Sequence, residues 1–122
     1  VVNIGSMYAM VSPDQRVYES KHVANPPFYG AAKAALLQWT RYAACEFGQE
    51  GIRINAISPG PFPSIKVQEE SPEFVTILAN KVPMGRVGRA EEIQGPLSFL
   101  ISDASSFVNG TNLVVDGGWT CW

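Results

Sequence analysis

The chain has 122 residues, of which 46% are hydrophobic and only 16% are charged, and its formal net charge is −2. This length allows one small domain or part of a larger one, and the low charge suggests that a partner, another subunit or further chain covers much of the surface. Without a basic cluster, nucleic acid and anionic membranes are not expected partners. No apolar run approaches the ~20 residues of a membrane span. The two cysteines suggest neither a disulfide framework nor a metal site, so we expect a reducing compartment, the cytoplasm.

The first half of the chain predicts a strand, a long loop, a helix and a second strand. Residues 1–4 have the composition of a short buried strand. A polar loop follows, over residues 6–27. Small and apolar residues then recur at helical spacing over residues 29–48, with no internal proline. Alternating apolar residues at 52–57 predict the second strand.

Prolines and glycines divide the second half. We expect no regular structure over residues 58–63, because three prolines remove backbone donors and fix φ. A serine N-cap and a proline at the first helical position predict a helix over 72–81. Another helix is predicted over 90–101, bent at its internal proline, and a last strand over 110–115. This order of elements predicts an α/β layer of parallel strands joined by right-handed crossovers.

Tyr29 and Lys33 lie four residues apart on the predicted helix and therefore share one of its faces. A phenol has a reference pKa of about 10 and exchanges protons poorly at neutral pH. A cation one turn away favours the phenolate and brings the pKa of the phenol toward the working range. The pair could therefore transfer protons, although the same spacing also occurs on ordinary amphipathic surfaces.

Several segments, in the same order, follow the pattern of one known family. They are residues 2–6 (VNIGS), 29–33 (YGAAK), 55–60 (NAISPG), 83–86 (PMGR) and 110–118 (GTNLVVDGG). Together they resemble the C-terminal half of a short-chain dehydrogenase/reductase. The resemblance covers essentially the whole chain and implies an α/β fold, the C-terminal half of a Rossmann-like doubly wound parallel sheet. Residues 1–122 would then be the catalytic and substrate-binding half of a single domain.

The resemblance also implies the roles of individual residues. Ser6 would hold the substrate oxygen, Tyr29 would transfer the proton, and Lys33 would lower the tyrosine pKa and bond the nicotinamide ribose. The cofactor, NAD or NADP, would contact Tyr29, Lys33, Pro59, Gly60 and Ser64. The substrate would contact Ser6, Met7, Tyr8, Pro61 and Phe62, beneath a lid formed by residues 64–80.

Such a protein would be an NAD(P)-dependent oxidoreductase that transfers hydride between nicotinamide and an alcohol or carbonyl compound. The polar loop suggests a sugar or sugar acid as the small-molecule substrate, and the family implies a homo-oligomer, either a dimer or a tetramer. The alternative is a truncated, non-catalytic module retained for assembly, and an unrelated α/β binding domain is a third reading. The intact trio of Ser6, Tyr29 and Lys33 favours the enzyme.

Two departures from the family qualify these expectations. No G-x-G-x-x-G motif occurs, so we expect that the dinucleotide-binding half is absent and that this piece alone is inactive. The interval between Ser6 and Tyr29 is longer than is usual in the family. Its extra loop either recognises a polar substrate at the mouth of the site or is a solvated excursion, and a lone loop histidine is more often exposed than catalytic. The polar residues of that loop are Asp14, Arg16, Tyr18, Glu19, Lys21 and His22.

Overall fold

Three parallel strands form the central layer of the protein. The computed structural model describes residues 1–18 and 24–122. Its sheet contains β1 (Val2–Ile4), β2 (Asn55–Pro59) and β3 (Asn112–Val115), in the order β1-β2-β3 and with both pairs parallel. The predicted parallel strands are therefore confirmed, although β2 begins later than the sequence predicts. Within the described residues, no helix is long and apolar enough to cross a bilayer.

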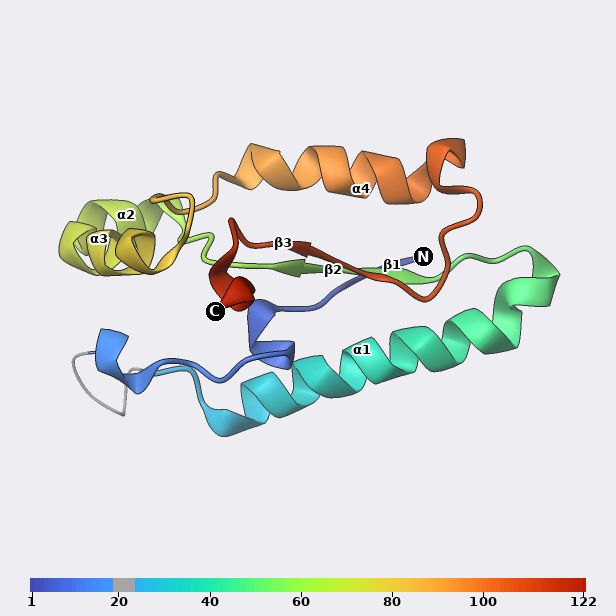
Figure 1. Cartoon of the computed structure of the whole chain (residues 1–122), viewed down its shortest axis with the longest axis horizontal. Helices are drawn as coiled ribbons and strands as arrows, with labels where there is room; N and C mark the ends of the chain where they lie inside the picture. The colour runs from blue at the N-terminus through green and yellow to red at the C-terminus, as the bar shows by residue number, and fades with distance from the viewer. Residues whose placement is uncertain (19–23) are drawn as a thin grey trace.

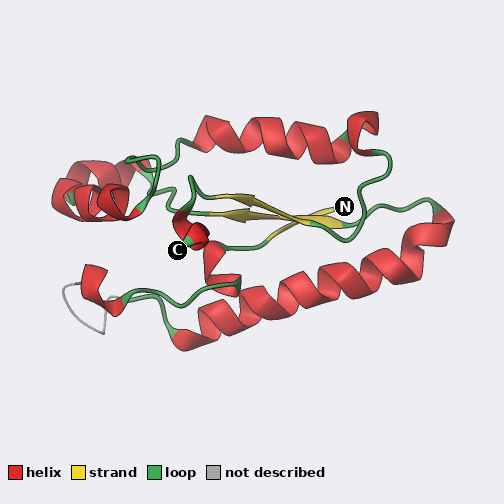
Figure 2. Ribbon diagram, viewed as in Figure 1, coloured by secondary structure: helices red, strands yellow, loops and turns green. Residues whose placement is uncertain are grey.

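Helices cover both faces of this sheet, as Figures 1 and 2 show. α1 (Pro27–Phe47) lies on one face and α4 (Gln94–Ile101) lies on the other. The connection from β1 to β2 and the connection from β2 to β3 move in the same direction across the sheet. Because α1 and α4 lie on opposite faces, the two crossovers have opposite hands. The prediction of right-handed crossovers throughout is therefore wrong for one connection. The handedness rule assumes a helix that leads directly back to the sheet, whereas two further helices separate β2 from α4.

Those two helices, α2 (Ile65–Glu70) and α3 (Pro72–Lys81), lie beyond the carboxyl ends of the strands (Figure 1). The predicted bounds of α3 are confirmed, and Pro72 occupies the first helical position, where a missing N–H leaves no bond unmade. Ser71 occupies the predicted N-cap position, but its side chain makes no capping bond. The sequence did not predict α2. The connections also contain short 3-10 turns: η1 (Met7–Ala9), η2 (Gln15–Val17), η3 (Gly48–Glu50), η4 (Ala90–Ile93), η5 (Asp103–Ser105) and η6 (Trp119–Cys121).

β2 extends through Pro59, which contradicts the irregular structure expected for residues 58–63. The N–H of Gly60 donates to the Val115 carbonyl of β3 at 2.9 Å. Successive N–H groups of a strand point to opposite sides, so the nitrogen of Pro59 points toward the side of β1. Because β1 has already ended at Ile4, the proline removes no bond from the ladder.

The predicted helix over residues 90–101 is divided into η4 and α4. Pro96 lies in the first turn of α4, where its missing N–H interrupts no α-helical bond within that helix. The bend expected at Pro96 is therefore replaced by a change from 3-10 geometry in η4 to α-helical geometry in α4.

Two buried clusters hold the layers together. Ala43 and Ala44 of α1 pack with Ile54, at the amino end of β2. The second cluster joins η1, α3 and the C-terminal turn at the carboxyl ends of the strands. It contains Met7, Tyr8, Leu78, Val82 and Trp119. Open parallel sheets bind ligands at this end, so the second cluster lies where a functional site is expected.

Candidate active site

A cavity of about 890 Å³ opens at the carboxyl ends of β1 and β2. Its volume suits a small-molecule ligand. The segments that follow β1 and β2, the first turn of α1, and α2 with α3 form its wall. The predicted site residues that line it are Ser6, Met7, Tyr8, Tyr29, Gly60, Pro61 and Phe62. In the described part of the chain, no group of His, Cys, Asp and Glu side chains is arranged to hold a metal ion.

Ser6 is held in place by the turn that it begins. The residue is buried, and its Oγ accepts a hydrogen bond of 3.1 Å from the backbone N–H of Tyr8, which caps η1. A hydroxyl that accepts in this way still has its own hydrogen to donate. Ser6 can therefore offer an O–H donor to an oxygen in the cavity.

Tyr29 and Lys33 lie one turn apart near the start of α1. The Nζ of Lys33 donates to the Ile4 carbonyl at 2.8 Å and lies 5.7 Å from the centroid of the Tyr29 ring. A cation at that distance is attracted to an aromatic face. The lysine is therefore fixed between the end of β1 and the tyrosine, outside the cavity lining, while Tyr29 itself lines the cavity.

Gly30 lets α1 approach the segment that carries the serine. A Cβ on this glycine would lie 2.8 Å from the backbone oxygen of Tyr8, well inside ordinary contact distance. The glycine therefore sets how closely Tyr29 can approach Ser6. Its place between Tyr29 and Lys33 was visible in the sequence, but the contact that requires a glycine was not.

The remaining predicted cofactor residues are placed differently. Pro59 and Ser64 do not line the cavity, and the Oγ of Ser64 accepts a bond of 3.4 Å from the N–H of Val67 as the cap of α2. Gly60 does line the cavity, but a Cβ there would lie 2.5 Å from the Cα of Asp116. The packing of β2 against the end of β3 therefore requires this glycine, whatever occupies the cavity.

Part of the long loop contributes to the cavity wall. The hydroxyls of Tyr8 and Tyr18 are hydrogen-bonded at 3.0 Å, and the Nδ2 of Asn25 donates to the Tyr18 hydroxyl at 3.3 Å. All three side chains line the cavity. This arrangement favours substrate recognition over a solvated excursion for the described part of the loop. Burial and the bond to Tyr18 raise the pKa of the Tyr8 phenol above its ordinary value, so it stays protonated at neutral pH.

Sequence reasoning did not identify Asn25, because the sequence contained no signal that this residue reaches the cavity. The other predicted loop residues, Glu19, Lys21 and His22, lie outside the residues that the structure describes.

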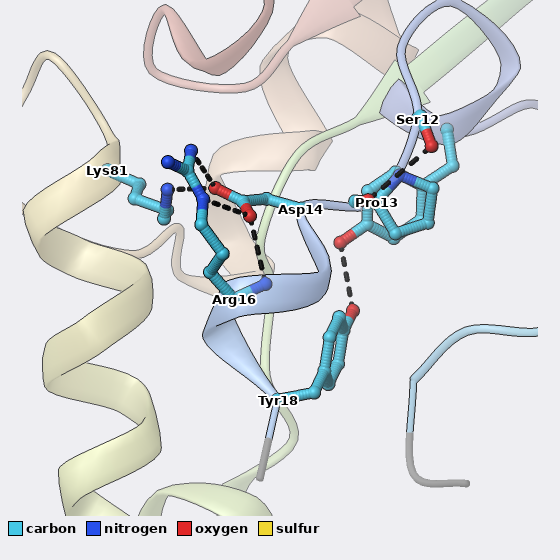
Figure 3. Close-up of polar contacts among 7 residues, drawn as sticks. Ser12, Pro13, Asp14, Arg16, Tyr18 and Lys81 are labelled. Carbon is cyan, nitrogen blue, oxygen red and sulfur yellow. Dashed lines mark hydrogen bonds and ion pairs between the residues drawn. The ribbon is translucent and has the colours of Figure 1, made fainter. Parts of the chain in front are cut away.

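An ion-pair cluster fastens the loop to α3 (Figure 3). The carboxylate of Asp14 accepts bonds of 2.9 Å from both Nε and Nη2 of Arg16, and it also pairs with Nζ of Lys81. The N–H of Arg16 donates to the same carboxylate, which thereby caps η2. These bonds hold the pKa of Asp14 well below its usual range. The carboxylate therefore stays ionised at neutral pH and ties η2 to α3.

A family model described as Enoyl-(Acyl carrier protein) reductase matches residues 5–120. Galactitol 2-dehydrogenase (L-tagatose-forming) from Cereibacter sphaeroides is 38% identical over 128 residues, which cover 100% of this chain and 46% of that protein.

Solved structures match over the same extent. A short-chain dehydrogenase from Leptospira borgpetersenii serovar Hardjo-bovis, with bound NAD+, is 36% identical with a TM-score of 0.86, covering 98% of this chain and 43% of the other. A gluconate 5-dehydrogenase from Burkholderia cenocepacia, in complex with NADP and tartrate, is 30% identical with a TM-score of 0.84. The match covers 99% of this chain and 44% of the other. The chain therefore spans less than half the length of these relatives. The match confirms the predicted fold class, and the assignment of residues 1–122 to one half of a single domain remains a prediction.

Proposed function

We infer the function of this chain from the family to which it belongs, the short-chain dehydrogenases/reductases. As part of its full-length protein, it catalyses hydride transfer between NAD or NADP and the carbon of an alcohol or carbonyl compound. One observation carries this proposal: Ser6 and Tyr29 line a single cavity, and Lys33 is fixed beside the Tyr29 ring. The relatives solved with NAD+ and with NADP support the class of cofactor.

The described residues fit the nicotinamide end of such a cofactor. Lys33 uses one of its three N–H donors on Ile4, and its other donors suit the hydroxyls of a ribose. Gly60 and Tyr29 line the adjoining cavity. When bound there, the cofactor would supply or accept the hydride. β1 and β3 are the two edge strands of the described sheet, and the relatives are more than twice as long as this chain. We place the pyrophosphate site in further chain that joins the β1 edge, the edge nearer to Ser6 and Lys33.

The three polar residues have separate tasks in this mechanism. Tyr29 donates its phenolic proton to the carbonyl oxygen during reduction, and it takes a proton from the hydroxyl during oxidation. Ser6 donates its unused O–H to the same oxygen and stabilises the negative charge that develops there. The ammonium of Lys33 faces the Tyr29 ring and stabilises the charge that the phenol carries after giving up its proton.

For the substrate we propose a sugar, a sugar acid or a related polyhydroxy compound. The cavity wall carries polar hydrogen-bonding groups from Ser6, Tyr8, Tyr18 and Asn25 in addition to its apolar side chains. Relatives named as galactitol and gluconate dehydrogenases support the same class. A wall of this kind suits a ligand with several oxygens better than an acyl chain or a steroid.

We also propose that the protein is a homo-oligomer in the cytoplasm. Large apolar side chains are exposed on α1 and α4, among them Phe28, Trp39, Tyr42, Phe99 and Ile101. Exposed apolar surface of this extent usually contacts another subunit or further chain. Cys45 and Cys121 are free and exposed, as thiols are in a reducing compartment.

The same exposed surface is what a non-catalytic assembly module would use, and that module is the second candidate function. An assembly module does not account for the cavity or for the placement of Ser6, Tyr29 and Lys33, so we favour the enzyme.

Turnover by the full-length protein separates the two candidates. Tyr29→Phe should lower kcat by about 10²–10⁴-fold, because the proton donor is lost, while the oligomer stays intact. Tyr42→Phe is the matched control, since this tyrosine lies on the same helix and is 58% exposed. Wild-type protein that turns over no alcohol, or Tyr29→Phe that keeps full turnover, would refute the catalytic assignment.

A further inference from the structure

A chain of three hydrogen-bonding side chains lies along the cavity wall. Asn25 donates from Nδ2 to the Tyr18 hydroxyl at 3.3 Å, and that hydroxyl lies 3.0 Å from the hydroxyl of Tyr8. Ser6 and Tyr29 line the same cavity. A ligand bound to Ser6 and Tyr29 therefore shares this cavity with the two tyrosine hydroxyls.

Among the residues that the structure describes, these bonds leave one phenolic O–H donor without an acceptor. If Tyr18 donates to Tyr8, the O–H of Tyr8 has no acceptor in the pair. If Tyr8 donates instead, the Tyr18 oxygen accepts two bonds, from Tyr8 and Asn25, and the O–H of Tyr18 is unused. Each phenol has one hydrogen, and Asn25 only donates to the chain. In both arrangements, one phenolic O–H remains available to an oxygen in the cavity.

The surrounding structure holds the pair in place. Tyr8 is buried in the cluster that includes Leu78 of α3. The Tyr18 ring lies 5.8 Å from that of Phe74, also on α3. Tyr18 directly follows η2, which Asp14 caps and ties to α3 through Lys81. Because both tyrosines are supported by α3, their hydroxyls are pre-positioned, and little side-chain freedom is lost when a ligand binds.

We propose that the Tyr8–Tyr18 pair donates a hydrogen bond to a second oxygen of the substrate, separate from the oxygen at the reacting carbon. The pair thereby selects polyoxygenated alcohols over simple ones. This inference rests on the proposed function, since it assumes that the reacting oxygen binds to Ser6 and Tyr29.

The charge of the cavity wall specifies the second oxygen further. Glu70 and Glu73 both line the cavity, and the Glu70 carboxylate also pairs with the Nζ of Lys66 at 3.9 Å. The negative charge of these carboxylates, above all that of Glu73, disfavours a carboxylate in the same space. The second oxygen is therefore a neutral hydroxyl, and among sugars and sugar acids the pair favours the neutral sugars.

Three ring compounds test this selection with the full-length protein: cyclohexanol, cyclohexane-1,4-diol and 4-hydroxycyclohexanecarboxylate. They share the reacting alcohol and differ only in the distal group. We expect kcat/KM for the diol to exceed that for cyclohexanol by about 10–100-fold, because a buried donor is left unpaired by the simpler alcohol. The carboxylate should be a poorer substrate than the diol.

Phenylalanine substitutions locate the donor. In the double variant with Tyr8→Phe and Tyr18→Phe, the ratio of kcat/KM for the diol to kcat/KM for cyclohexanol should fall to about 1, and Tyr42→Phe should keep the wild-type ratio. One of the two single variants should reproduce the loss and so identify the residue that contacts the substrate. If the double variant does not fold, the single variants decide the question.

The outcomes also separate this inference from the function on which it rests. Equal kcat/KM values for the diol and cyclohexanol in wild-type protein would overturn the inference, as would a diol preference that survives both single variants. A protein that turns over none of these alcohols would instead count against the proposed function.

Discussion

Gly30→Ala tests whether the approach of α1 to η1 positions the catalytic residues. The added Cβ would lie 2.8 Å from the Tyr8 carbonyl oxygen, about 0.6 Å short of ordinary van der Waals contact. The obstacle is backbone, which no side-chain rotation can relieve. The start of α1, with Tyr29, must therefore move away from the segment with Ser6.

Two energies compete in this variant. Replacing glycine by alanine within a helix stabilises a protein by about 0.5–1 kcal/mol. Overpacking against a fixed neighbour costs about 1–3 kcal/mol. The difference is a net destabilisation of about 0–2.5 kcal/mol, centred near 1 kcal/mol, and a domain of 150–250 residues loses about 2–4 °C in Tm per kcal/mol. Displacement of the proton donor should also lower kcat by about 10–100-fold.

Gly95→Ala is the matched control for this experiment. A Cβ on Gly95, in the first turn of α4, would meet no atom within 4 Å. The same chemical change should therefore leave kcat unaltered and raise Tm slightly. Thermal unfolding and steady-state kinetics of both full-length variants provide the comparison. The reasoning is refuted if Gly30→Ala matches Gly95→Ala, with a raised Tm and unchanged kcat.

The other predictions concern two carboxylates. Bonds from Arg86 and from the N–H of Arg89 lower the pKa of Glu92 from 4.5 to about 2, so its stabilising effect is complete above pH 4.5 and is lost as pH falls toward 2. The Tm difference between wild type and Glu92→Gln should shrink over that range, and a constant difference would contradict the assignment. Asp14→Asn should loosen the loop from α3 and raise KM for the diol by up to about fivefold with little change in kcat. A fall in kcat at unchanged KM would show that the ion-pair cluster does not act through substrate binding.

Local sequence signals predicted most of the elements correctly. The long run of small and apolar residues predicted α1 to within two residues at either end, and a proline after a polar residue located the start of α3. The sequence did not predict α2, because a helix of six residues is too short to show a helical repeat of apolar residues. The position of Pro59 within β2 was not predicted either, because it depends on β1 ending at Ile4.

Some residues of the candidate site could be predicted from the sequence, and others could not. Ser6, Tyr29 and Lys33 could be identified because each belongs to a short segment whose pattern is visible in the sequence alone. The roles of Tyr18, Asn25 and Gly30 depend on contacts between segments that lie apart in the chain, with Tyr8 as the common partner of Tyr18 and Gly30. No local pattern encodes such contacts, so the structure was needed to find them.

A crystal structure of the full-length protein with a nicotinamide cofactor and cyclohexane-1,4-diol tests the central claim most directly. We predict that one hydroxyl oxygen of the diol lies within hydrogen-bond distance, about 2.5–3.2 Å, of both the Ser6 Oγ and the Tyr29 hydroxyl. A diol whose hydroxyls both lie beyond the reach of Tyr29 would contradict the assignment of this cavity as the active site.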